Sequence, residues 1–149
     1  MPDYAGASKA IRDRFVAAWG TTTPVQIQNT DPPLNPWPPS PPVPWVYLEV
    51  LNSTSELRGA GLPGDHVWLY TGNIFVHIFV PINYGIDDVE AFAVQAGEIY
   101  RAQTFYNEAG TGVKVICGAP MVQGGLSDAD EGNWYRLTCM VPFEYYHRG

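Results

Sequence analysis

The chain has 149 residues, of which 46% are hydrophobic and 15% charged, and its formal net charge is −7. This length is typical of one domain, and so high a hydrophobic fraction excludes a disordered chain. The negative charge argues against a protein that grips duplex DNA, and no apolar run is long enough for a transmembrane helix. Aromatic residues reach 13% while charges are scarce, which indicates that part of the surface meets other protein.

The N-terminal part predicts a helix and a short strand. Apolar residues between Tyr4 and Trp19 recur on one helical face, Asp3 can cap the start, and Gly20 follows the end. The alternation of polar and apolar residues over 25–29 favours a half-buried strand.

Residues 31–44 form a proline-rich loop, with prolines at positions 32, 33, 36, 38, 39, 41, 42 and 44. Proline lacks an amide donor and fixes φ, so we expect extended chain here instead of a helix or a central strand. A stiff connection between strands is favoured over a docking arm for an SH3-type domain. Trp37 and Trp45 pack either against a neighbouring subunit or on their own chain.

The middle of the chain predicts two strands. Residues 45–52 form the first strand, and residues 53–65 are expected to form a glycine- and serine-bearing loop. Residues 67–80 form the second strand, with a bulge or turn at Gly72. Both faces of this second strand are mostly apolar, which is typical of a central strand covered on each side.

The C-terminal half predicts a helix and two more strands. Residues 86–104 form the helix, in which Gly97 is expected to let another element pack closely. A strand over 113–123, broken by Gly118 and Pro120, follows, then a glycine-rich acidic loop over 124–132, and a last strand over 134–146 that runs antiparallel to the previous one.

The motifs that would indicate chemistry are weak. Residues 59–64 match the dinucleotide pattern G-x-G-x-x-G, but a strand follows them where a phosphate site needs a helix N-terminus. The acidic loop lacks the frame of a calcium loop. Cys117 and Cys139 are expected to be buried thiols, and His77 a partly packed sheet residue. We therefore predict no enzymatic activity, no catalytic residue, no cofactor and no metal site.

Four segments then follow one another along the chain: WVYLEV, GNIFVHIFVPINYG, IDDVEAFAVQAGEIYRAQTF and NWYRLTCMVPFEYY. They come after the predicted N-terminal helix, the short strand and the proline-rich loop. Gly72 stands before an alternating strand, Gly85 in a turn, and Phe105 at the end of an amphipathic helix. In this layout nearly the whole chain resembles the tail terminator proteins of bacteriophages with long, non-contractile tails.

The resemblance implies an α/β (α+β) fold, akin to the tail tube protein, in one domain over residues 1–149. A mostly antiparallel sheet of four to five strands would carry two packed helices. It also implies a virion protein that assembles in the host cytoplasm as a homohexameric ring at the head-proximal end of the tail.

The implied partners are other copies of the chain, the major tail tube protein, the head–tail connector or stopper protein and the tape-measure protein. The ring would stop tube polymerisation and offer the surface for head attachment. Genome DNA would pass through the lumen without specific binding, and no membrane would be involved. The alternatives are another head–tail joining protein, a tail tube protein, or a peptide-binding module.

A terminator has interfaces in place of an active site. The segment 53–65 is the best candidate for reaching a tube subunit or a ring neighbour, and the acidic loop is assigned to the lumen or the opposite face. Two arginines are expected to pair across subunits, and the C-terminal tyrosines either contact an adjacent protein or fray. The candidate interface residues are Trp37, Trp45, Leu57, Arg58, Leu62, Arg101, Asp128, Asp130, Glu131, Tyr145 and Tyr146.

Overall fold

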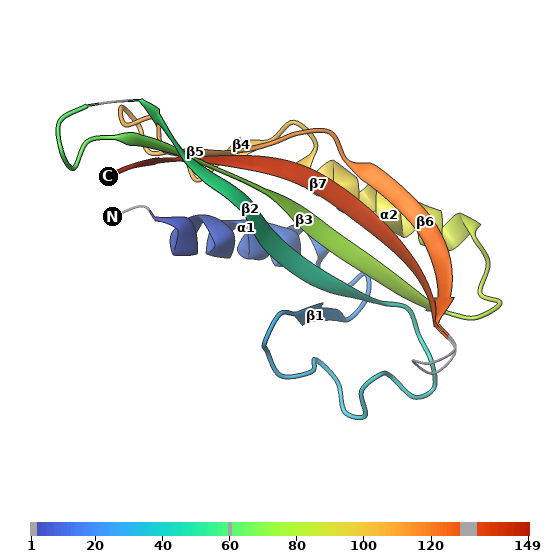
Figure 1. The fold of residues 1–149 in the computed structure, drawn as a ribbon. Helices are drawn as coiled ribbons and strands as arrows, with labels where there is room; N and C mark the ends of the chain where they lie inside the picture. Colours follow the sequence, from blue (N-terminus) through green and yellow to red (C-terminus); the bar gives the residue numbers. More distant parts are fainter. Residues whose placement is uncertain (1–2, 60, 129–133) are drawn as a thin grey trace.

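The computed structural model describes residues 3–59, 61–128 and 134–149. Within these residues two helices lie against one face of a curled, seven-stranded sheet (Figure 1). The predicted α+β class is confirmed, but the sheet has more strands than the four to five expected. The elements are α1 (Tyr4–Trp19), β1 (Val25–Ile27), β2 (Trp45–Gly59), β3 (Val67–Pro81), α2 (Asp87–Tyr100), β4 (Thr104–Phe105), β5 (Lys114–Cys117), β6 (Met121–Asp128) and β7 (Trp134–Arg148).

The strand order is β1-β2-β3-β7-β5-β4, and β6 also pairs with β7. Each of these pairings is antiparallel except that of β1 with β2, which is parallel. The prediction of a mostly antiparallel sheet is therefore confirmed. β3 and β7 form its centre, with residues 67–81 of β3 paired along residues 134–148 of β7.

The extra strands arise in two places, at the break between β5 and β6 and after α2, where the chain forms β4. The break predicted at Gly118 and Pro120 is confirmed and divides the strand over 113–123 into β5 and β6, since Pro120 has no amide to offer a ladder. The predicted end of the second helix, at residue 104, is wrong. α2 ends at Tyr100, Ala102 adopts a φ of 52°, and the chain re-enters the sheet as β4.

The expectation of a loop over residues 53–65 is wrong for its first half. β2 continues to Gly59 and pairs with β3, so that Thr54 lies opposite Thr71 and Leu57 opposite Trp68. Threonine favours strands, and serine is compatible with an exposed one once a partner strand is present. β3 is continuous through Gly72, and the irregularity lies opposite, on β2.

Gly72 is required by the close approach of its neighbours. A Cβ there would clash with the Leu51 carbonyl oxygen and would lie 2.9 Å from the Phe143 ring. The register of β2 shifts between Asn52 and Thr54, directly across from this glycine. The sequence therefore predicted the place of the bulge but not the strand that carries it.

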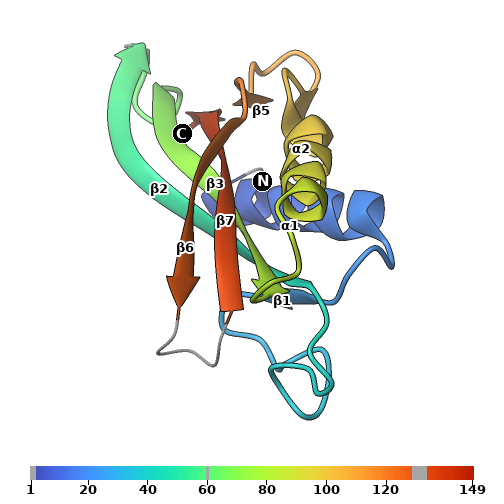
Figure 2. The same cartoon turned by 90° about the vertical axis from the view of Figure 1, so that its right-hand side faces the viewer.

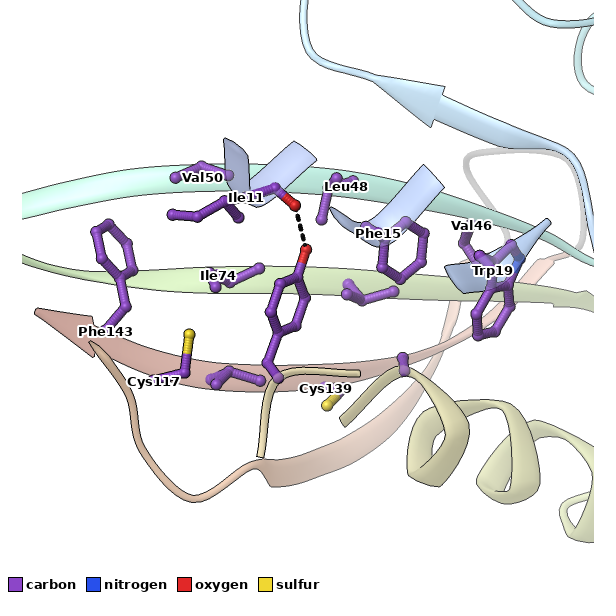
Figure 3. Close-up of a cluster of buried hydrophobic side chains, with 14 of the residues drawn as sticks. Ile11, Phe15, Trp19, Val46, Leu48, Val50, Ile74, Cys117, Cys139 and Phe143 are labelled. Atoms are coloured by element: carbon purple, nitrogen blue, oxygen red, sulfur yellow. Dashed lines mark hydrogen bonds between the residues drawn. The ribbon is translucent and has the colours of Figure 1, made fainter. Parts of the chain in front are cut away.

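Both helices pack on the same face of the sheet, and they enclose the main core (Figures 2 and 3). α1 begins where the Asp3 carboxylate accepts from the Gly6 amide at 2.7 Å, and it ends at Gly20 with a φ of 58°. Both predicted caps are confirmed. The labelled side chains of Figure 3 come from α1, β2, β3, β5 and β7, and Ile11 O accepts from the buried Tyr100 hydroxyl at 2.7 Å.

The close packing predicted at Gly97 is also confirmed. A Cβ on this residue would lie 2.8 Å from Pro120 Cβ and 3.4 Å from Cys139 Sγ. Glycine therefore lets α2 sit directly on the start of β6 and the middle of β7.

Candidate interaction surfaces

The distal part of the β2–β3 hairpin projects from the body of the molecule (Figure 1). We call residues 51–59 and 61–66 the arm. Every side chain from Leu51 to Arg58 is exposed, and Leu62 at the turn is 79% exposed. The arm therefore places two of the predicted interface leucines, Leu57 and Leu62, where another protein can contact them.

The base of the arm is held by the C-terminus. The His66 amide donates to Gly149 O at 3.1 Å, and the Gly149 amide donates back to His66 O at 3.0 Å. Trp68 Nε1 also donates to Gly149 O at 3.1 Å. The C-terminal residues are thus ordered by β3, and the alternative that they fray is wrong.

The two arginines expected at subunit contacts have partners within their own chain. Arg58 lies 3.2 Å from the Glu56 carboxylate, and Arg101 lies 2.7 Å from Glu98. All four side chains are more than half exposed. Such exposed pairs contribute about 1 kcal/mol at most, so they leave these arginines available to other carboxylates.

Trp37 and Trp45 belong to an aromatic cluster on the face of the sheet that carries no described helix. Trp45 stacks on Phe79 with ring centroids 4.2 Å apart, and Trp37 from the proline-rich loop meets the edge of Trp45 at 4.7 Å. Trp134 closes the cluster at 6.1 Å from Trp45. Both tryptophans pack on their own chain, and a contact with a neighbouring subunit stays a prediction.

The two C-terminal tyrosines differ although they are adjacent. Tyr145 is fully buried in the core beside Tyr70 and Tyr106, and burial raises the pKa of its hydroxyl. Its assignment to an interface is therefore wrong. Tyr146 points to the other face of β7 and remains half-buried.

The acidic candidates lie largely outside the described residues. Asp128 is the last residue of β6, and nothing is described of its side chain. Asp130 and Glu131 fall outside the described residues altogether.

The side chains that could take part in chemistry, two cysteines and a histidine, are packed into the sheet. Burial raises the pKa of the Cys117 thiol to about 12 and that of Cys139 to about 11, so both are protonated at neutral pH. The expected buried thiols are confirmed. His77 lies between the rings of Tyr47 and Phe75, at 6.0 and 5.8 Å, and its Nδ1 is 2.9 Å from Thr138 Oγ1.

The surroundings of His77 lower its pKa and so disfavour its protonated, charged form. Burial lowers its pKa, the Glu49 carboxylate 3.9 Å away works in the other direction, and Arg136 lowers the pKa further. The expectation of a partly packed sheet histidine is confirmed. A neutral ring held between aromatic neighbours stabilises the sheet.

Among the described residues, no group of three or more His, Cys, Asp or Glu side chains could hold a metal ion. Nor is any helix in the described ranges both long and apolar enough to cross a membrane. In the described part of the G-x-G-x-x-G pattern, Gly61 and Gly64 lie at the turn of the arm, and β3 follows them.

The sequence analysis predicted the surface of the arm but not its strand conformation, and it did not predict the exposed outer edge of β6. Met121 and Val122 are 46% and 45% exposed, although they stand in a strand beside β7. The signal that could have revealed this edge was the Gly118–Pro120 break, since it detaches the apolar residues after it from β5.

No family model and no curated protein matches this chain. A solved structure that carries no descriptive name is similar in fold, with a TM-score of 0.62 at 18% sequence identity. The match covers 93% of this chain and 94% of that chain. The arrangement of two helices on one curled sheet therefore recurs over nearly the full length of both proteins.

Proposed function

We propose that this chain is a structural subunit of a bacteriophage tail, the terminator. Copies of it would form a ring at the head-proximal end of the tail tube, stop tube polymerisation and provide the surface for head attachment. The partners would be the major tail tube protein on one side of the ring and the head–tail connector or stopper protein on the other.

The observation that carries the proposal is the order of the elements. The resemblance requires a helix, a short strand, a proline-rich loop, a long strand, a strand–turn–helix unit and a closing strand. The chain presents these as α1, β1, residues 31–44, β2, then β3 with α2, and finally β7. The fold supports the proposal at the level of this layout.

The arm adds support of a different kind. A ring subunit needs surfaces for its neighbours and for the proteins above and below it. The arm exposes a run of side chains on both of its faces, including Leu57 and Leu62, and it projects away from the core. We assign it to the contact with a tube subunit or with the next copy in the ring.

The test is the distribution of tail lengths in lysates in which the Trp19 codon is replaced by an amber codon, measured by negative-stain electron microscopy. A host that suppresses the codon by inserting tryptophan is the matched control. Overlong or ragged tails without heads are expected in the non-suppressing host, and uniform tails with heads in the control.

Each of the other possible results would favour one of the alternative functions. Tails of normal length that fail to join heads would indicate a head–tail joining protein. Absence of tails, with purified chain that polymerises alone into filaments, would indicate a tube protein. Normal tails joined to heads would contradict every tail function and would favour a peptide-binding module built on the proline-rich loop.

A further inference from the structure

The outer strands of the sheet are paired along only part of their length. β1 covers β2 only from Val46 to Leu48, and the Val50 amide donates to the Gln28 side chain, which closes that ladder. β4 covers β5 on the other side with two residues. In the described residues no strand pairs with the outer edge of β2 beyond this point, or with the outer edge of β6.

These two free edges are only partly protected against pairing, since each has a bulge and charges stand only toward the far ends, at Glu56, Arg58 and Asp128. Proteins block exposed edges with proline, lysine or other charges, with β-bulges, or by keeping them very short. Residues 50–55 of β2 and 121–127 of β6 contain no proline and no charged residue. The bulges of β2 and β6 bend these edges but leave backbone donors and acceptors along them.

The free edges also carry apolar side chains that a monomer would leave in water. Leu51 on β2 is 44% exposed, which is close to the values of Met121 and Val122 on β6. A contact that joins the two edges would cover these side chains and complete the backbone hydrogen bonds together.

We propose that β6 of one copy of this chain pairs with the distal part of β2 in the next copy, so that the sheets join. This inference deepens the proposed function, on which it rests for the ring, by naming the contact between subunits. The partner at each edge is a second copy of the same chain.

The topology fixes the direction of this contact. β2 is antiparallel to β3, β3 to β7, and β7 to β6, so β2 and β6 of one copy run in opposite directions. Copies placed beside one another in the same orientation therefore meet through an antiparallel ladder. This is the pairing with the better hydrogen-bond geometry, and it keeps the helices of all copies on one side of the joined sheet.

The two edges lie at opposite ends of the sheet. β6 pairs with residues 134–140 of β7, whereas the distal part of β2 lies across β3 from residues 143–148 of β7. Each added copy is consequently displaced along the strand direction relative to the last one. A stagger of this kind is what a sheet needs in order to close on itself, and a repeated head-to-tail contact that closes forms a ring.

The test is site-directed crosslinking with a short bismaleimide. One chain carries a cysteine on β2, T54C or S55C, and another carries a cysteine on β6, V122C or Q123C. Successive strand residues point to opposite faces, so each pair of positions samples both faces. The native cysteines are buried with raised pKa values and give little background. A91C, on the exposed side of α2, is the matched control.

Crosslinking is carried out on the purified chain and on tails from lysates supplied with these variants. We expect a β2–β6 crosslink in at least one mixture and a ladder of oligomers from the chain with both cysteines. No product above the A91C level in either preparation, or β2–β2 products alone, would overturn the proposal. Overlong tails in the amber lysate together with a failed crosslink would leave the terminator function standing and reject only this contact.

Discussion

The two faces of the sheet serve different purposes. On the helix-covered face, side chains such as Phe15, Ile74 and Val141 are completely buried. On the opposite face the buried side chains are those of Leu69 and of the cluster around Trp45, and Phe75 and His77 remain partly exposed. The comparison indicates that the first face determines whether the chain folds, while the second face and the free edges are available for contacts between proteins.

The largest predicted effect is a difference in stability loss between substitutions on the two faces. F15A removes a ring that stacks between Trp19 and Tyr100, and we expect a loss of about 3 to 5 kcal/mol in the free energy of unfolding. F75A removes the same ring from the other face and should cost less than half as much. Urea denaturation measures both, provided that the m-values stay equal. Equal losses would mean that the outer face is a second core.

A smaller effect is expected at the contact between α2 and the sheet. G97A would place a methyl group against the rigid Pro120 ring, and we expect a loss of about 1 to 3 kcal/mol despite the better helix propensity of alanine. V94A, on the exposed side of the same helix, is the control and should change stability by about 0.5 kcal/mol or less. A stabilised G97A variant would contradict the close packing described for the inner face.

The aromatic cluster on the outer face should respond more weakly still. W37A removes the ring that meets the edge of Trp45, and such aromatic pairs contribute about 0.5 to 1.5 kcal/mol beyond the area they bury. We expect a loss of about 1 kcal/mol and a red shift of the remaining tryptophan fluorescence. Unchanged stability and emission would show that the proline-rich loop is not held by this contact.

These contrasts could be anticipated only in part from the sequence. The spacing from Tyr4 to Trp19 correctly predicted the helix and its buried side, and the glycine at 97 correctly predicted a close crossing. The interface assignment of Tyr145 failed because its aromatic character was weighed without the alternation of β7, which puts it on the same face as Phe143 and Val141. The first half of the arm was expected to be a loop because its serines and glycines are typical of loops when no partner strand is known.

The smallest predicted effect is a pH dependence of folding stability that arises from His77 on the outer face. The pKa of His77 in the folded chain lies below its ordinary value, so the unfolded chain takes up this proton first as the pH falls. The stabilisation from a neutral His77 is therefore complete above the unfolded pKa, near 6.5, and is lost as the pH drops below it. H77Q should lose stability less steeply than the original chain between neutral and mildly acidic pH, as measured by thermal unfolding. A steeper loss would mean that Glu49 outweighs burial.

The most direct measurement of the central claim is the tail-length distribution in the Trp19 amber lysate, supplied in turn with the original chain, with M121K and with V94K. M121K places a charge on the free edge of β6, whereas V94K places one on exposed α2. We expect uniform tails with the original chain and with V94K, and overlong tails with M121K although it folds. Tails of normal length in the amber lysate with no chain supplied would contradict the account.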